Sequence, residues 1–298
     1  MTSRRVLAAA PMLISALVLS ACGSGAPGKN STGQLTVVTS FYPLQYAAEQ
    51  IGGGHVAVTN LTRPGAEPHD IELTTHDVAT VSKAGLVIYE KGLQGAVDKA
   101  AQSQAGNRAL DVAPAADLNL RLTSGGIDPH FWLDPQRYST VANAISARLS
   151  SADPAHKAEY EKNAKVFEDK LAALSAQFTS DLAGCRRRDL VTSHAAFGYL
   201  AQRFGMKQVA INGLSPEQEP NAAQIAAVST YARAKGVTTV YAETLASPAI
   251  AATVARESGA KVATLDPIEG LTKASSGKNY FEIMHSNLTT LRAGHGCL

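Results

Sequence analysis

Short apolar runs alternate with stretches of helical periodicity along most of the chain. In the first part the pattern predicts strands at Leu35–Thr39, His55–Leu61 and Leu86–Tyr89, with helices at Pro43–Gln50 and Thr75–Lys83. The second part repeats it, with strands at Leu190–Thr192, Gln208–Ile211, Thr238–Tyr241 and Lys261–Leu265 and helices at Ala222–Ala234 and Pro248–Ser258. Strands that alternate with helices are typical of parallel sheets. The pattern therefore predicts an α/β protein with parallel sheets.

The longest helical pattern lies between these two parts. Apolar residues recur at steps of three and four from Tyr160 to Leu182, after Asp153-Pro154 and before Gly184. Roughly thirty helical residues would form a rod of about 45 Å, long enough to span two lobes. We therefore expect an N-terminal α/β lobe over residues 35–152, a rigid connector helix over 153–184 and a C-terminal α/β lobe over 185–298.

The first 34 residues have the composition of an export signal and a tether. Arg4 and Arg5 precede an apolar run that ends in Leu19-Ser20-Ala21-Cys22, which resembles a bacterial lipobox. We expect residues 1–21 to be removed as a lipoprotein signal peptide and Cys22 to carry the lipid; cleavage by an ordinary signal peptidase is the alternative. The glycine-rich residues 22–34 would then form a flexible tether. This predicts a lipid-anchored protein on the extracytoplasmic face of the cell membrane.

The charge balance argues against a nucleic-acid partner. The 298 residues include 27 Lys and Arg against 25 Asp and Glu, and loss of Arg4 and Arg5 with the signal leaves 25 against 25. A nucleic-acid binder would carry a basic excess. We therefore expect no nucleic-acid partner. Separately, we expect the protein to be a monomer. Because an exported protein meets an oxidising compartment, we also expect the two other cysteines, Cys185 and Cys297, to form a disulfide, with two buried thiols as the alternative.

Three histidines and two acids stand where a ligand site is expected. His69 lies in a loop after a predicted strand, and His130 lies between prolines before a helix. His194, Glu243 and Asp266 each follow a predicted strand. Ligands of open parallel sheets bind beyond the carboxyl ends of the strands. Imidazole and carboxylate groups delivered to one such edge predict a metal site.

Several segments of the chain, in order, resemble motifs of the zinc/manganese substrate-binding lipoproteins of bacterial ABC importers. They are Gly65-Ala-Glu-Pro-His-Asp70, Asp128-Pro-His-Phe-Trp-Leu-Asp-Pro135, Thr192-Ser-His-Ala-Ala-Phe-Gly-Tyr199, Leu265-Asp-Pro-Ile268 and the closing Tyr280-Phe-Glu-Ile-Met-His-Ser-Asn-Leu288. The resemblance runs from Leu35 almost to the end. It implies two lobes joined by a long helix, with one metal ion between them.

The resemblance also implies a ligand set. It assigns His69 and His130 from the N-terminal lobe and His194 and Asp266 from the C-terminal lobe, with Glu243 supporting the ligands from behind. Three imidazoles and one carboxylate suit four-coordinate Zn²⁺, whereas Mn²⁺ prefers more oxygen ligands. Members that carry manganese have a carboxylate where this chain has His194, which favours zinc; a manganese-binding member is the alternative.

The resemblance implies a membrane permease and a separate ATPase as partners. The chain contains no GxxxxGKS loop, so we expect that it does not itself couple ATP hydrolysis. It implies no enzymatic activity. A zinc hydrolase with Glu243 as general base would be the alternative from another class, although no HExxH motif is present. An adhesin role is a further alternative.

The lipobox yields the first testable prediction. Replacing Cys22 by Ala should leave a soluble, mis-processed or released protein, because the acyl chains that hold the parent on the membrane can no longer be attached. Membrane fractionation and mass spectrometry of the mature N-terminus measure this. A variant that stays with the membranes, together with a parent that carries no acyl chain, would contradict the assignment.

Overall fold

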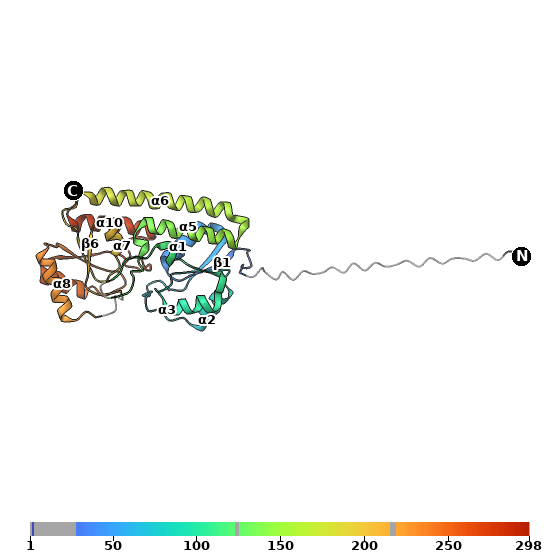
Figure 1. Cartoon of the computed structure of the whole chain (residues 1–298), viewed down its shortest axis with the longest axis horizontal. Helices are drawn as coiled ribbons and strands as arrows, with labels where there is room; N and C mark the ends of the chain where they lie inside the picture. The colour runs from blue at the N-terminus through green and yellow to red at the C-terminus, as the bar shows by residue number, and fades with distance from the viewer. Residues whose placement is uncertain (1, 3–27, 123–124, 215–218, 298) are drawn as a thin grey trace.

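The computed structural model describes residues 2, 28–122, 125–214 and 219–297. The predicted cleavage site and Cys22 lie outside these residues. Two lobes lie side by side, each built on one sheet, and helices run along them (Figure 1). Among the helices of the described residues, none combines the length and the hydrophobicity needed to cross a membrane.

The N-terminal lobe contains a parallel four-stranded sheet of order β2-β1-β3-β4. Its strands are β1 (Leu35–Thr39), β2 (Val56–Asn60), β3 (Leu86–Tyr89) and β4 (Ala109–Asp111), and its helices are α1 (Tyr42–Gly52), α2 (Thr75–Lys83), α3 (Gly95–Ala100) and α4 (Ala113–Ala116). Every residue of β3 is buried, as expected of a central strand covered on both faces.

The C-terminal lobe repeats this arrangement with the order β6-β5-β7-β8, again all parallel. Its strands are β5 (Asp189–Thr192), β6 (Lys207–Ala210), β7 (Thr239–Ala242) and β8 (Lys261–Thr264), and its helices are α7 (Gly198–Arg203), α8 (Ala222–Ala234) and α9 (Ala249–Ser258). In each lobe the first strand lies between the second and the third. The predicted fold class, two α/β lobes with parallel sheets, is confirmed.

Three further helices pack along the lobes. They are α5 (Pro135–Ala152), α6 (Lys157–Ala183) and α10 (Tyr280–His295), and α6 extends along both lobes (Figure 1). At 1.5 Å per residue its length is about 40 Å. Its buried residues are those that the periodicity singled out, from Tyr160 to Leu182, and they belong to one apolar core that includes residues of both lobes. This shared core supports the rigidity expected of the connector.

The connector helix begins later than the predicted boundary at Asp153. A 3₁₀ turn over Pro154–His156 precedes α6. The Asp153 carboxylate makes no capping bond to the turn and accepts instead from Lys29 Nζ (3.0 Å) and the Tyr160 hydroxyl (2.9 Å). It therefore ties the start of the described chain to the connector.

The end of the predicted tether is also part of the folded lobe. Thr36 donates its N–H to the Gly28 carbonyl (2.8 Å), and Lys29 forms an antiparallel bridge with Leu35. The Asn30 side chain closes the turn by accepting from the N–H of Gln34 (2.9 Å). Residues 28–34 contain no large apolar side chain, so the apolar pattern could not reveal these backbone contacts.

A disulfide joins Cys185, just after α6, to Cys297, just after α10. It links the cysteines that the sequence analysis paired, which are 112 residues apart. The Cys297 N–H also donates to the Arg292 carbonyl (3.1 Å), so the C-terminus is fixed to the end of the connector.

We expect the native exported protein to contain no free thiol at these two positions. A loop of this length contributes about 4–5 kcal/mol in the chain-entropy model, so Cys185→Ser/Cys297→Ser should unfold at lower denaturant concentration. Thiol counting under denaturing, non-reducing conditions and urea titration measure these effects. Two titratable thiols in the native protein would reject the bridge.

Candidate metal centre

Three of the predicted ligands converge between the lobes, together with a carboxylate that was not predicted. His69 lies in the loop after β2, and His130 precedes the short helical turn that leads into α5. His194 follows β5, and Glu269 follows β8. One ligand atom from each of these four residues lies within 4.8 Å of all the others. Each lobe therefore contributes two of them.

The Oε1 atom of Glu269 lies among the imidazole Nε2 atoms. Its distances are 2.9 Å to His130, 3.3 Å to His194 and 3.4 Å to His69. The Nε2 atom of His130 lies 3.3 Å from that of His69 and 3.5 Å from that of His194. Ligand atoms at roughly 2.0–2.1 Å from a tetrahedral zinc ion are about 3.3–3.4 Å apart. Most of these distances match the edges of such a tetrahedron.

Buried carboxylates orient two of the imidazoles through their other nitrogen. His130 Nδ1 lies 2.7 Å from Asp128 Oδ1, which also accepts the backbone N–H of His130 (2.9 Å). His194 Nδ1 lies 2.5 Å from one oxygen of Glu243, whose other oxygen accepts the N–H of His194 (2.9 Å). Carboxylate–histidine pairs fix the tautomer that leaves Nε2 free for a metal. Glu243 thus lies behind His194, in the supporting position that was expected of it.

Asp266 is not part of the cluster, although it was the predicted fourth ligand. Its Oδ1 atom accepts the N–H of Ile268 (2.8 Å), and its backbone pairs with the Asn287 side chain. Ile268 has a φ of 59°, in the left-handed region that β-branched residues rarely adopt. The turn made by Asp266 and Ile268 redirects the chain after β8, so that Glu269 enters the cleft instead.

Opposing effects set the pKa values of the buried groups. Burial alone would lower the pKa of His130 and His194, but the carboxylates beside them outweigh burial and raise both, that of His194 well above its usual range. Burial would raise the pKa of Glu269, yet the three imidazoles hold it well below its usual range. Burial and the charge of Glu269 raise the pKa of Glu67 to about 8. Without a metal, protons on the imidazoles balance the Glu269 carboxylate.

Two functional residues were missed, for different reasons. Asp128 opens a motif quoted above, but its pairing with His130 depends on the Pro129 turn that separates them. Glu269 lies one residue beyond Leu265-Asp-Pro-Ile268. Asp266 was favoured because the resemblance assigned the fourth ligand to it, and it directly follows a predicted strand. Pro267 was a sequence signal for Glu269, because a proline ends the strand pattern and indicates a turn before that residue.

Known zinc-uptake and zinc-binding proteins are similar to this chain. Residues 37–294 match the model of the family described as zinc-uptake complex component A, periplasmic. The chain is 35% identical over 297 residues to the high-affinity zinc uptake system protein ZnuA of Bacillus subtilis, covering 93% of each chain. It is 33% identical over 287 residues to the zinc-binding protein AdcA of Streptococcus pyogenes. That alignment covers 87% of this chain but 56% of AdcA, so the chain spans about half the length of that relative.

A solved structure shares the architecture. It is that of the laminin-binding protein Lmb of Streptococcus agalactiae, described as bifunctional with adhesin and metal transporting activity. The TM-score is 0.80 at 33% sequence identity, over 87% of this chain and 98% of that one.

The pKa directions predict opposite pH dependences for the metal-free and zinc-loaded protein. A raised histidine pKa means that His194 stabilises the metal-free fold below the unfolded value of about 6.5 and that this stabilisation is lost as pH rises through the folded pKa. Zinc needs neutral imidazole, so stabilisation by zinc should grow over the same range. Urea unfolding with chelator or with zinc, at pH values from mildly acidic to alkaline, measures both.

The His194→Gln variant is the control, because it removes the titrating group. The difference in free energy of unfolding between the metal-free parent and this variant should decrease as pH rises above neutrality. A difference that grows with pH would contradict the direction of the His194 pKa.

Proposed function

Because the chain belongs to the family of the zinc-uptake complex component A, we propose that it is the extracytoplasmic zinc-binding component of an ABC importer. The observation that supports this best is the cluster of His69, His130, His194 and Glu269, to which each lobe contributes two residues. Most distances between their ligand atoms match those around a tetrahedral zinc ion. An ion held there contacts both lobes at once. Capture would therefore lock the lobes together, and separation of the lobes would release the ion.

The chemistry of the donors favours zinc over manganese. Three imidazole nitrogens and one carboxylate oxygen form a nitrogen-rich set that suits Zn²⁺, whereas Mn²⁺ prefers oxygen-rich sites. The relatives named above are described as zinc-binding or zinc-uptake proteins. Zinc is thus the proposed cargo, carried as a bound ion and not consumed.

The same geometry weighs against a zinc hydrolase. Catalytic zinc sites keep one position open for water and need a nearby general base. Here four protein groups surround one point, and both oxygens of Glu243, the candidate base, are bonded to His194. We infer binding and transfer, with a membrane permease and a separate ATPase as partners and a lipid at Cys22 as the anchor.

The proposed ligand set is tested with substitutions that remove one ligand group at a time. Glu269→Gln should lower the affinity for zinc by more than about 100-fold. This exceeds the loss usual for residues that only hydrogen-bond to a metal ligand. The affinity for zinc should fall by a comparable factor in each of the variants His69→Ala, His130→Ala and His194→Ala. Glu243→Gln should cost about 10–100-fold, because only the orientation of His194 is lost. Calorimetric titration of metal-free protein measures the affinities.

Two variants serve as controls. His285→Ala removes an exposed histidine of α10 and should leave zinc affinity unchanged. Asp266→Asn should have a smaller effect than Glu269→Gln, because Asp266 shapes the turn and lies outside the cluster. Parent-like zinc binding by Glu269→Gln, or a parent that prefers manganese, would overturn the proposal.

A further inference from the structure

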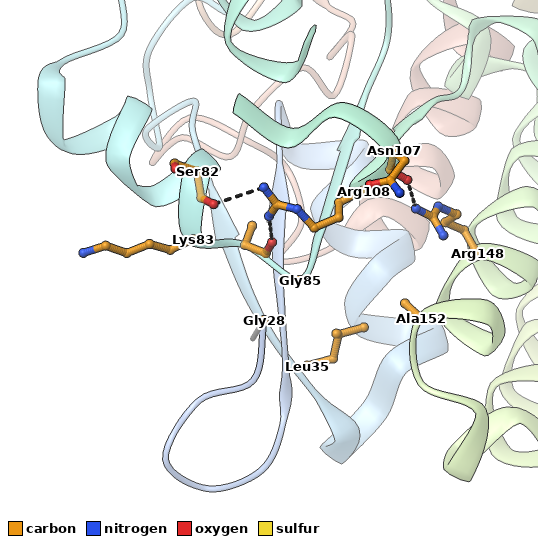
Figure 2. A pocket seen from close by; sticks show the side chains of 10 residues that line it. Gly28, Leu35, Ser82, Lys83, Gly85, Asn107, Arg108, Arg148 and Ala152 are labelled. Carbon is orange, nitrogen blue, oxygen red and sulfur yellow. Dashed lines mark hydrogen bonds between the residues drawn. The ribbon is translucent and has the colours of Figure 1, made fainter. Parts of the chain in front are cut away.

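A basic pocket lies at the edge of the N-terminal lobe opposite the metal centre. Its volume is about 720 Å³, and it opens where β1 and β3 begin, beside Leu35 and Gly85. Since the strands are parallel, this is the amino edge of the sheet, whereas the metal ligands follow its carboxyl edge. The lining residues include Lys83 from the end of α2, Arg108 from the turn before β4 and Arg148 from α5; in Figure 2 the Lys83 side chain points away from the two arginines.

These three cations are not neutralised by acids. No acidic side chain lines the pocket, and none of the three forms an ion pair within the described part of the chain. The guanidinium of Arg108 donates to the carbonyls of Ala84, Ser82 and Gln104, and Arg148 donates to that of Asn107 (Figure 2 shows those to Ala84, Ser82 and Asn107). Carbonyl oxygens satisfy N–H donors but leave the positive charge uncompensated. The pocket thus favours an anionic group.

Asp153, which follows the lining residue Ala152, does not alter this balance. It is buried, and its carboxylate pairs with Lys29 at 3.0 Å and with His156 at 2.6 Å. These partners lower its pKa to about 2 against the opposing effect of burial. Its charge is therefore engaged by Lys29 and by hydrogen bonds to groups outside the lining set.

The continuous described part of the chain begins at this pocket, six residues after Cys22. Gly28 lines it, and its carbonyl accepts both the N–H and the hydroxyl of Thr36 (2.8 Å each). Gly28 and Gly85 touch through their backbones: a Cβ atom on Gly28 would lie 2.5 Å from the Gly85 Cα atom, and one on Gly85 would lie 2.4 Å from the Gly28 oxygen. Side chains are excluded at both positions, so the exit point is fixed.

This fixed exit limits how far the pocket lies from the lipid. The six residue steps from Cys22 to Gly28 can span at most about 20–22 Å. With acyl chains on Cys22, the pocket is held at the membrane surface within that reach. Anionic surfaces attract basic segments, with an effect of roughly fivefold in affinity for each charge near the surface.

We propose that this pocket binds the phosphate groups of anionic membrane lipids, as a second membrane attachment beside the predicted lipid at Cys22. Arg108 and Arg148 lie at the pocket wall, and Lys83 stands exposed at its rim. The contact is electrostatic and is therefore weakened by salt. Because it uses the edge of the lobe away from the metal ligands, it leaves zinc binding unchanged.

The test uses the full lipidated protein in vesicles, after mass spectrometry has verified the acyl chains. Vesicles of phosphatidylcholine alone are compared with vesicles that also contain phosphatidylglycerol. Amine acetylation read by mass spectrometry reports the exposure of each lysine. Lys83 should react several-fold more slowly on the anionic vesicles. Lys235, also exposed and at the end of a helix, α8 in the other lobe, should react equally on both.

A matched pair of variants separates the pocket from mere proximity to a charged surface. The Arg148→Gln variant keeps Lys83 as the reporter. In this variant Lys83 should lose most of its protection from acetylation on the anionic vesicles. Arg256→Gln, an exposed arginine of α9, should behave as the parent. Zinc titration of Arg148→Gln should give the parent affinity, and this readout tests the proposed function separately.

Three results would each overturn the proposal. One is equal reactivity of Lys83 on both kinds of vesicle in the parent. Another is protection in Arg148→Gln equal to that in the parent, which would indicate a general surface effect. The third is equal protection by inorganic phosphate added to neutral vesicles, which would indicate a site for a free anion. A parent without acyl chains would remove the premise and overturn it too.

Discussion

A buried carboxylate among three imidazoles is the constraint on which the rest of the structure depends. Glu269 is 1% exposed, and an unpaired charge at that depth would be costly. Either protons on the histidines or a bound cation must balance it. The two solutions exclude one another at each Nε2 atom, so metal binding displaces protons. The Glu269 charge is consequently balanced by protons without the metal and by the ion with it, which suits a carrier that alternates between loaded and empty states.

The fold fixes this cluster through contacts between the lobes. Trp132, two residues after His130, donates its indole N–H to the Pro267 carbonyl (2.7 Å), two residues before Glu269. The Tyr280 hydroxyl of α10 donates in turn to the Trp132 carbonyl (2.6 Å). The backbone strain at Ile268 is held by the same turn. A change at the metal centre therefore reaches the lobe contact within a few bonds, and the single tryptophan lies where it would sense the change.

The sequence predicted the strands and the connector helix of this protein well. It predicted less well the features that depend on backbone conformation or on backbone contacts. The strands and the connector were recognisable because their apolar spacing is set by burial. The three histidines were recognisable because they lie in loops or at a strand end, within motifs that resemble a known family. Glu269 was missed since its entry into the cleft depends on a left-handed backbone at Ile268, which no side-chain pattern signals. The folded residues 28–34 were missed for a similar reason, because Gly28 and Gly85 meet through backbone atoms. Strand β4 was missed because three residues carry too little periodicity.

The N-terminal lobe is electrostatically polarised along its strands. Acids gather beyond the carboxyl ends: Asp128 lies behind His130, and the charges of Asp128, Asp111 and Asp98 add to burial in raising the pKa of Glu90 well above its usual range. At the amino ends the pocket is lined by three cations and, within the described residues, by no acid. Five residues of β1 separate the two edges by about 17 Å, and salt screens the exposed charges at the pocket over about 8 Å at physiological ionic strength. Parallel strands thus let one small lobe attract a cation at one end and an anionic surface at the other, with little interference between the two.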